Sequence, residues 1–292
     1  MMRGTIQRER GADRFTGHPS PVIDTGRFPP ISLDALVHHA GLMTRVDRKY
    51  LVPLEIAADL VARLDPATRS LEIDGKRDFA YDSVYFDTDD DLAYRITAQR
   101  RRRRFKVRTR SYLDTGGCFL EIKTKSGRGA TVKQRTAYAS ENRAALTDAG
   151  RDYVRHVLCA EGHESTLVDR LEPTLVSRYH RTTLLLPEGS RATIDTRLHW
   201  FDLHREYRLD STRDSDPIGM SELPAHAIIE TKSVGGASDL DRALWRAGHR
   251  PTGISKFGTG TAALRPLLPR NKWSRQLRGP FALQPSPKDT TS

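Results

Sequence analysis

The side chains with the clearest chemical potential lie between positions 100 and 125, where the chain reads RRRRRFKVRTRSYLDTGGCFLEIKTK. From position 105 onward, basic residues occupy every second position, at Lys106, Arg108 and Arg110. This period of two predicts a β-strand with one cationic face. The DTGG turn and the alternation in FLEIKTK (119–125) extend it to a hairpin. Arginine forks and lysine ammonium groups bind phosphate oxygens, so this face is suited to a phosphate-bearing ligand.

Composition limits the classes of protein to which the chain can belong. With 292 residues, 37% hydrophobic and 29% charged, it fits a globular protein of one large or two small domains. No apolar run approaches the roughly 20 residues of a membrane-spanning helix, and the N-terminal stretch lacks the apolar core of a secretory signal. Cys118 and Cys159 offer neither a disulfide framework nor metal-ligand spacing. These features predict a cytoplasmic protein.

The net charge of +11 is concentrated at the two ends of the chain, because 1–30 and 269–292 together carry more than half of it. Both segments are polar and show no periodicity, so we interpret them as a disordered basic arm and a disordered basic tail. The folded domain is predicted to span 31–268. A high net charge alone is weak evidence for nucleic-acid binding. We therefore treat nucleic acid as a secondary partner, and the Arg100–Arg104 run as a feature with an electrostatic role.

At least five of the predicted strands place basic residues on one face. Two interpretations fit this pattern: the faces are solvated outer surfaces, or they line the interior of a closed antiparallel β-barrel. Charges enclosed in a barrel resist desolvation unless water or an anion accompanies them, so such a barrel would hold a polyanion. Carboxylates among the cations, as in the pairs Glu121/Lys123 and Glu230/Lys232, would then bind Mg²⁺ or Mn²⁺ shared with phosphate.

The sequence resembles the VTC-domain polyphosphate polymerases, a branch of the triphosphate tunnel metalloenzymes of the CYTH superfamily. The resemblance implies an α+β fold in which eight antiparallel strands close into a barrel, the triphosphate tunnel, with helices packed outside. It is carried by nine short segments that run in the family's order: RKYLV (48–52), SVYFDT (83–88), KVRTRSY (106–112), FLEIKTK (119–125), TVKQR (131–135), SRYHRTTL (177–184), RATIDT (191–196), AIIETKS (227–233) and ISKFGTG (254–260).

Roles for individual residues follow from the same resemblance. It implies that Glu230 binds the metal ion, that Glu121 has a weaker claim to do so, and that Tyr85, Phe86 and Asp87 are structural. The residues expected to act in catalysis are Arg108, Arg110, Lys123, Arg181, Arg191 and Lys232. Those expected to bind phosphate are Lys49, Arg108, Arg110, Lys123, Lys133, Arg178, Arg181, Arg191, Ser255 and Lys256.

The implied activity is that of a polyphosphate polymerase, which transfers the γ-phosphate of ATP to a polyphosphate chain in the tunnel and releases ADP, with Mn²⁺ or Mg²⁺ as cofactor. Two positions depart from relatives. Tunnel triphosphatases and cyclases carry Glu-x-Glu-x-Lys on the first strand, where this chain has one acid, Asp47. Gly253 stands where eukaryotic polymerases carry a lysine. A triphosphatase or polyphosphatase of the same fold, and a non-catalytic binder of polyphosphate or RNA, remain as alternatives.

Overall fold

The computed structural model describes residues 23–40, 45–125, 131–203 and 220–281. Most of the predicted basic arm (1–22) and the end of the predicted tail (282–292) lie outside these residues. Within the described part of the chain, no helix is long and apolar enough to cross a membrane.

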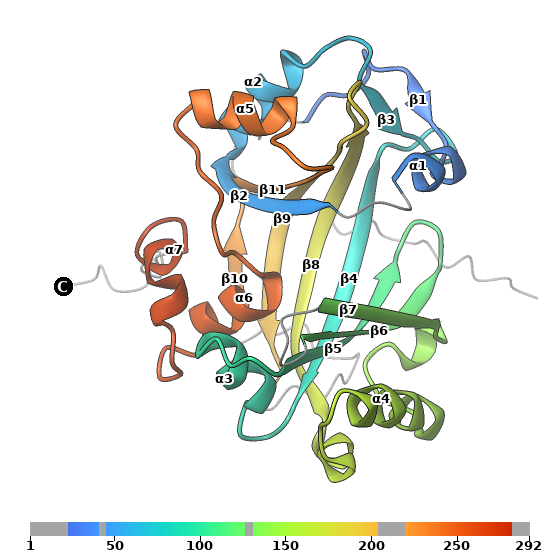
Figure 1. Cartoon of the computed structure of the whole chain (residues 1–292), viewed down its shortest axis with the longest axis vertical. Helices are drawn as coiled ribbons and strands as arrows, with labels where there is room; N and C mark the ends of the chain where they lie inside the picture. Colours follow the sequence, from blue (N-terminus) through green and yellow to red (C-terminus); the bar gives the residue numbers. More distant parts are fainter. Residues whose placement is uncertain (1–22, 41–44, 126–130, 204–219, 282–292) are drawn as a thin grey trace, which may run out of the picture.

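One large antiparallel sheet forms the body of the protein, with helices around it, so the predicted α+β class is confirmed (Figure 1). Eight strands form its main path. In spatial order they are β2 (Val46–Pro53), β11 (His226–Ser233), β9 (Arg191–Asp202), β8 (Glu172–Leu185), β4 (Asp78–Asp87), β5 (Arg104–Tyr112), β6 (Cys118–Lys125) and β7 (Thr131–Ala137). Three shorter strands lie off this path: β1 (Pro30–Ile31), β3 (Arg69–Leu71) and β10 (Met220–Leu223).

The prediction of a closed barrel is corrected by this topology. Among the described residues, β2 and β7 stand at opposite ends of the path and do not pair with each other. The outer edge of β2 is occupied instead by the segment that leads into helix α6 (Lys256–Leu264), because the Thr252 amide donates to the Lys49 carbonyl at 2.7 Å. A covered edge has no free backbone groups at that point for another strand. The eight strands therefore make a curved, open sheet.

Alternation along the strands sorts side chains between the two faces of the sheet, as the sequence predicts. In β5 every second side chain, from Phe105 to Ser111, is fully buried, while Lys106, Arg108 and Arg110 are only partly covered. The cationic face of β5 is therefore opposite to the face that packs into the core. One strand thus contributes both to stability and to a charged surface.

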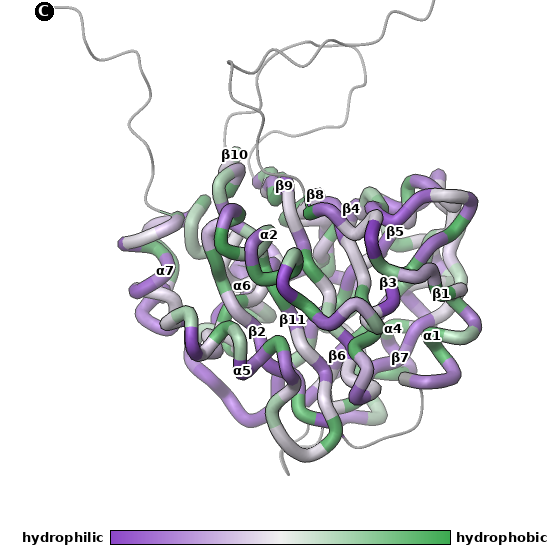
Figure 2. Tube along the Cα trace, turned by 90° about the horizontal axis from the view of Figure 1, so that it is seen from above, coloured by the Kyte–Doolittle hydropathy of each residue, from purple (hydrophilic) through white to green (hydrophobic). Residues whose placement is uncertain are grey.

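Two hydrophobic clusters hold the sheet and its helices together. Helices α2 (Leu54–Ala62) and α5 (Asp239–Arg246) cover β2, β9 and β11, with Tyr50 and Ile229 among the fully buried residues. The larger cluster involves α3 (Leu92–Ala98), α4 (Asp148–Ala160) and α6, while α1 (Leu33–Ala40) lies near β3 (Figure 1). The hydropathy-coloured trace shows apolar and polar segments alternating through these elements (Figure 2). Short 3-10 turns complete the list: η1 (Ser140–Asn142), η2 (Ser165–Arg170) and η3 (Asn271–Trp273).

The folded region extends beyond both predicted boundaries. Phe28, in the predicted arm, is 1% exposed, and Trp273, in the predicted tail, is completely buried. Trp273 sits on η3, is followed by α7 (Ser274–Arg278), and donates from its indole Nε1 to the Gly253 carbonyl at 3.1 Å. Its ring packs against Gly258, where a Cβ atom would lie 2.3 Å from it. A single aromatic anchor in a polar segment carries no periodic signal, which explains why sequence patterning missed it.

Close packing of α6 on Trp200 generates a test of the fold. A Cβ added at Gly260 would lie 2.3 Å from the Trp200 ring, whereas nothing lies within 4 Å of one added at Gly253. We expect Gly260→Ala to lower the free energy of unfolding by about 1–3 kcal/mol, because overpacking outweighs the better helix propensity of alanine. Chemical denaturation measures this, with Gly253→Ala as the matched control. A Gly260→Ala protein as stable as the wild type would contradict the packing described.

Candidate functional site

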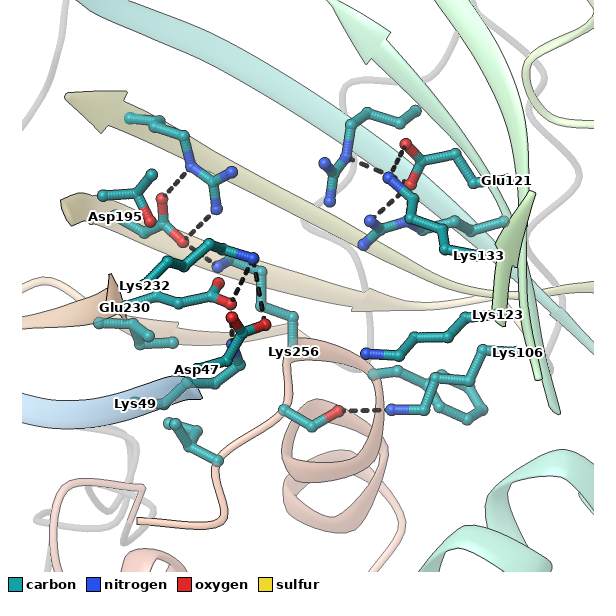
Figure 3. A pocket seen from close by; sticks show the side chains of 18 of the residues that line it. Asp47, Lys49, Lys106, Glu121, Lys123, Lys133, Asp195, Glu230, Lys232 and Lys256 are labelled. Atoms are coloured by element: carbon teal, nitrogen blue, oxygen red, sulfur yellow. Dashed lines mark hydrogen bonds and ion pairs between the residues drawn. The ribbon is translucent and has the colours of Figure 1, made fainter. Parts of the chain in front are cut away.

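A cavity of about 320 Å³ lies on the concave, charged side of the sheet (Figure 3). Its lining comes from all eight strands of the main path and from the start of α6, and it contains ten basic residues and four carboxylates. The basic residues are Lys49, Lys106, Arg108, Arg110, Lys123, Lys133, Arg181, Arg191, Lys232 and Lys256, and the acids are Asp47, Glu121, Asp195 and Glu230. The lining therefore has six positive charges in excess.

Glu121 neutralises one group of cations at the β5–β6–β7 side. Its Oε2 accepts from Arg108 Nη2 at 2.6 Å and from Arg108 Nε at 2.9 Å, and its Oε1 accepts from Lys133 at 2.7 Å. Burial alone would raise the pKa of Glu121, but the surrounding cations hold it well below its usual range. Because both oxygens are engaged by side chains, Glu121 is poorly placed to bind a metal ion, in contrast to its predicted role.

Asp195 anchors a second group from β8, β9 and α6. Its Oδ1 accepts from Arg181 Nε at 2.6 Å, its Oδ2 accepts from Arg181 Nη2 at 2.8 Å, and the Lys256 ammonium donates to Oδ2 as well. Asp195 is fully buried, which would raise its pKa, yet the two cations lower that pKa to about 2. This bidentate pair fixes Arg181 in place, so its remaining nitrogen is held at the cavity rather than free to move.

A third group, on β2 and β11, contains two carboxylates that share one lysine. Lys49 contacts Glu230 Oε1 at 2.5 Å, and the Lys232 ammonium lies 3.2 Å from Glu230 Oε1 and 3.2 Å from Asp47 Oδ2. The strand register explains this arrangement, since Glu230 lies opposite Lys49 and Lys232 lies opposite Asp47. Burial opposes the ionised form of Glu230, but Lys49 and Lys232 hold its pKa well below its usual range.

The strand register also aligns three lysines across β5, β6 and β7. Lys106 lies opposite Lys123, and Lys123 lies opposite Lys133. Like charges placed directly opposite each other destabilise a sheet. Lys133 contacts Glu121, but in the described part of the chain neither Lys106 nor Lys123 has an ion pair. Lys106 instead donates to the Ser255 hydroxyl at 2.9 Å. Burial, reinforced by Lys123 and other cations, lowers the pKa of Lys106 to about 7.

Two arginines of the cavity lining have a side-chain nitrogen that donates no hydrogen bond within the described residues. The Nε atoms of Arg110 and Arg191 are buried and have no hydrogen-bond partner among the residues that the structure describes. Leaving such a donor unpaired costs about 1–3 kcal/mol, and more for a charged group. Both residues line the cavity, so an anion bound there could accept from them. These two atoms are the most specific sign that the cavity is built for an anionic ligand.

The cavity brings together every predicted site residue except Arg178. Arg178 and Arg181 are three positions apart on β8, so they point to opposite faces of the sheet. The Arg178 side chain is 52% exposed, pairs with Asp82 at 3.1 Å and lies over the Phe201 ring. The prediction that Arg178 binds phosphate in the cavity is therefore wrong, because the face that carries Arg181 is the concave one.

Sequence reasoning missed four members of the site: Lys106, Asp47, Asp195 and Tyr85. Lys106 was on the cationic face of its strand, and Asp195 shares a face with Arg191, so period-two alternation was enough to nominate both. Tyr85, interpreted as structural, lines the cavity and accepts from Arg108 Nη1 at 3.1 Å. Asp87 does have a structural role, since its carboxylate accepts from three backbone amides around the start of α3.

The donors present are compatible with a divalent cation at one end of the cavity. Among the described residues no group of three or more His, Cys, Asp or Glu side chains could hold a metal ion alone. Mg²⁺ and Mn²⁺, however, are commonly bound by one or two carboxylates together with substrate phosphates. Asp47 and Glu230 already share one cation, the Lys232 ammonium. They therefore fit a metal ion that is completed by phosphate oxygens.

The low pKa of Lys106 predicts a pH dependence of anion binding. Above about pH 7 this lysine is largely neutral in the ligand-free protein, and binding an anion then requires proton uptake. We expect the affinity for tripolyphosphate to fall several-fold between about pH 7 and 9, with at most about tenfold per unit from one proton. Lys106→Arg, which stays charged, should flatten this dependence in titration calorimetry. An unchanged slope in Lys106→Arg would rule out Lys106 as its source.

Comparison with known proteins places the chain in a family. No curated protein matches it. Among solved structures, a "putative adenylate cyclase" from Vibrio parahaemolyticus is 12% identical, with 70% of this chain and 84% of that one covered and a TM-score of 0.34. A "putative adenylyl cyclase" from Hippeastrum, described as having a dominant triphosphatase activity, is 14% identical, with 75% and 96% covered and a TM-score of 0.46. Similarity at this level does not indicate the activity of this chain.

The VTC domain model, in contrast, matches residues 44–265, and the chain therefore belongs to the VTC domain family.

Proposed function

We propose that this protein is a metal-dependent polyphosphate polymerase that transfers the γ-phosphate of ATP to the end of a polyphosphate chain and releases ADP. The observation that carries this proposal is the excess of six positive charges in one cavity, together with the unpaired Nε donors of Arg110 and Arg191. Membership of the VTC domain family supports it. A polyanion with closely spaced charges is the ligand that such a cavity would hold most favourably.

Positioning of two anionic phosphates is the main task of such a site. The new bond forms between an oxygen of the acceptor's terminal phosphate and the γ-phosphorus, while the bond from the γ-phosphorus to the β–γ bridging oxygen breaks and ADP leaves. The attacking oxygen is already anionic, so neither a covalent nucleophile nor a strong general base is needed. Arg110, Arg191 and Lys123 have donors without a carboxylate partner closer than 4.0 Å in the described residues, and they would bind these phosphates.

Charge that develops on the transferred group is stabilised by cations that are already held in place. Arg181 is fixed by its bidentate pair with Asp195, and Arg108 is fixed in the same way by Glu121. Preorganised donors of this kind act without reorganisation cost during the reaction. Lys232 and Lys49, shared with Glu230, would change partners from carboxylate to phosphate when the substrate binds. Ser255 and Lys256, at the start of α6, would hold the neighbouring phosphates.

Mn²⁺ or Mg²⁺ would be held by Glu230 and Asp47. The ion would supply positive charge that neutralises the substrate phosphates. Glu121 is excluded from this role by its contacts with Arg108 and Lys133. Gly253 stands where eukaryotic polymerases carry a lysine, and Lys106, which reaches the Ser255 hydroxyl from β5, would supply a cation beside this serine.

One observation favours a second candidate function, the hydrolysis of triphosphate or polyphosphate. Hydrolysis needs a water molecule beside the metal ion, and two carboxylates near the ion would help to orient it. Asp47 and Glu230 provide such a pair, since both contact Lys232. The two activities would use the same cations and differ in the acceptor of the phosphoryl group.

Product analysis distinguishes these functions directly. The purified protein is incubated with ATP and Mn²⁺, with and without a short polyphosphate primer, and ADP, free phosphate and polymer are quantified. We expect polymer to form together with ADP and without matching free phosphate. Free phosphate in place of polymer would identify a hydrolase, and binding of polyphosphate without turnover would identify a non-catalytic binder.

Glu230→Gln tests the assignment of the metal ligand in the same assay. Loss of one carboxylate ligand should lower turnover by about 10²–10³ fold, as removal of a single electrostatic stabiliser does in other enzymes. Glu222→Gln is the matched control, because Glu222 lies outside the cavity beside His199. Turnover by Glu230→Gln at the control level would remove Glu230 from the reaction.

A further inference from the structure

The run of five arginines, Arg100–Arg104, is the strongest charged feature that the cavity does not use. It connects the end of α3 to the start of β5, the strand that carries Lys106, Arg108 and Arg110 into the cavity. Four of the five side chains are exposed and Arg104 is partly buried. Within the described residues none of the five forms an ion pair with a carboxylate. The run therefore presents its charge to solvent immediately next to the strand that lines the cavity.

Lys272 adds a sixth charge to this surface from a distant part of the sequence. It precedes Trp273, whose complete burial fixes the position of η3. The Lys272 ammonium donates to the Thr97 carbonyl near the end of α3 at 2.9 Å and lies over the Trp273 ring. This lysine is thus held beside the arginine run by two independent contacts. We refer to Arg100–Arg104 together with Lys272 as the basic ramp.

Arg104 and Lys106 connect the ramp to the cavity, because they lie two positions apart on the same face of β5. Burial, followed by repulsion from Arg104 and Arg100, lowers the pKa of Lys272 to about 8. Lys272 is in turn among the cations that lower the pKa of Lys106, after burial and Lys123. Each of these residues is close enough to its neighbour to repel it. The cations form one series from Arg100 outside, through Lys272, to Lys106 and Lys123 inside.

The series reaches the cavity at two lysines that have no carboxylate partner among the described residues. Figure 3 shows Lys106 and Lys123 on the side of the cavity away from Asp47 and Lys49. Asp47, Asp195 and Glu230 contact cations on β2, β8, β11 and α6, and neither Lys106 nor Lys123 has an ion pair in the described part of the chain. An anionic chain that leaves the cavity at Lys106 and Lys123 would therefore meet further cations rather than carboxylates.

We propose that the basic ramp binds the part of a polyphosphate chain that extends beyond the cavity. The chain would pass Lys106 and Lys123 where it enters and leaves the cavity. This inference rests on the proposed function, because it takes polyphosphate as the ligand of the cavity. A cavity of about 320 Å³ holds only a few phosphates, so a longer chain must continue outside. The ramp offers one charge per residue along its run, and a linear polyanion carries one charge per phosphate.

Single-stranded nucleic acid is the less suitable ligand for this surface. Proteins that bind single strands combine basic grooves with aromatic side chains on which bases stack. The arginine run contains no aromatic residue, and the ring over which Lys272 lies, that of Trp273, is completely buried. The ramp therefore offers charge without a stacking platform, which matches an inorganic polyanion.

The ramp predicts that affinity depends on chain length. We compare tripolyphosphate with a long-chain polyphosphate by titration at about pH 6, where Lys106 is charged in every variant. The triple variant Arg100→Gln/Arg102→Gln/Arg104→Gln should weaken binding of the long chain by about tenfold, as expected for three exposed charged contacts. Its affinity for tripolyphosphate should change by less than about twofold. The dependence of long-chain affinity on salt should also become shallower.

A matched control removes the same charge from another face. Arg242→Gln/Arg246→Gln/Arg250→Gln alters residues on and after α5, which lies at the other end of the molecule from α3 (Figure 1). We expect both affinities of this control to equal those of the wild type. Equal loss of long-chain affinity in the two triple variants would show that only net charge matters and would overturn the proposal. Retention of long-chain affinity by the ramp variant would overturn it as well, including a result in which RNA binding alone is lost.

Failure of the ramp and failure of the proposed function give different results. These titrations contain no ATP and require no turnover. An inactive protein that loses long-chain affinity in the ramp variant would support the ramp while contradicting the polymerase. A protein that is an active polymerase, but whose ramp variant keeps its long-chain affinity, would support the proposed function and contradict the ramp.

Discussion

Repulsion between like charges on the concave side of the sheet is the constraint on which the rest of the structure depends. Strand pairing places Lys106, Lys123 and Lys133 in one row, although like charges directly opposite each other destabilise a sheet. Glu121, Asp195 and Glu230 offset part of the repulsion in the cavity, and each does so by holding together cations from two different elements of the fold. The excess that remains is the reason why an anionic ligand would stabilise the protein, since binding only the folded state shifts the folding equilibrium towards it.

Apolar packing on the opposite face of the same strands offsets the free-energy cost of this charge repulsion. In β5, alternation gives one face for the core and one for the cavity, so Lys106, Arg108 and Arg110 are tied to buried neighbours in their own strand. Trp200 and Trp273 extend this principle to α6, because their rings lie where Gly260 and Gly258 leave no side chain. The helix that brings Ser255 and Lys256 to the cavity is therefore held by close packing on these two rings, together with the hydrogen bonds that their indoles donate to the Lys256 and Gly253 carbonyls.

Much of the site could be predicted because alternation fixes which side chains share a face. The inward placement of Arg108 and Arg110 follows from period two, and the family resemblance supplied Glu230. What failed depends on information that local patterns do not contain. Arg178 could be excluded only by knowing which face of β8 is concave, and barrel closure could be tested only by knowing that Thr252 covers the edge of β2. The packing of residues 269–281 onto the fold depends on one buried tryptophan, Trp273. The pairing of Asp47 with Glu230 through Lys232 depends on strand register.

The central claim is that the concave face of the sheet, and not its outer surface, binds the anion. Arg181 and Arg178 test it most directly, because they lie on the same strand and differ in the face to which they point. Tripolyphosphate affinity is measured by titration calorimetry for Arg181→Gln and Arg178→Gln, with thermal unfolding as a check on folding. The account predicts a loss of at least about tenfold for Arg181→Gln and less than about twofold for Arg178→Gln. Equal losses, or a greater loss for Arg178→Gln, would contradict it.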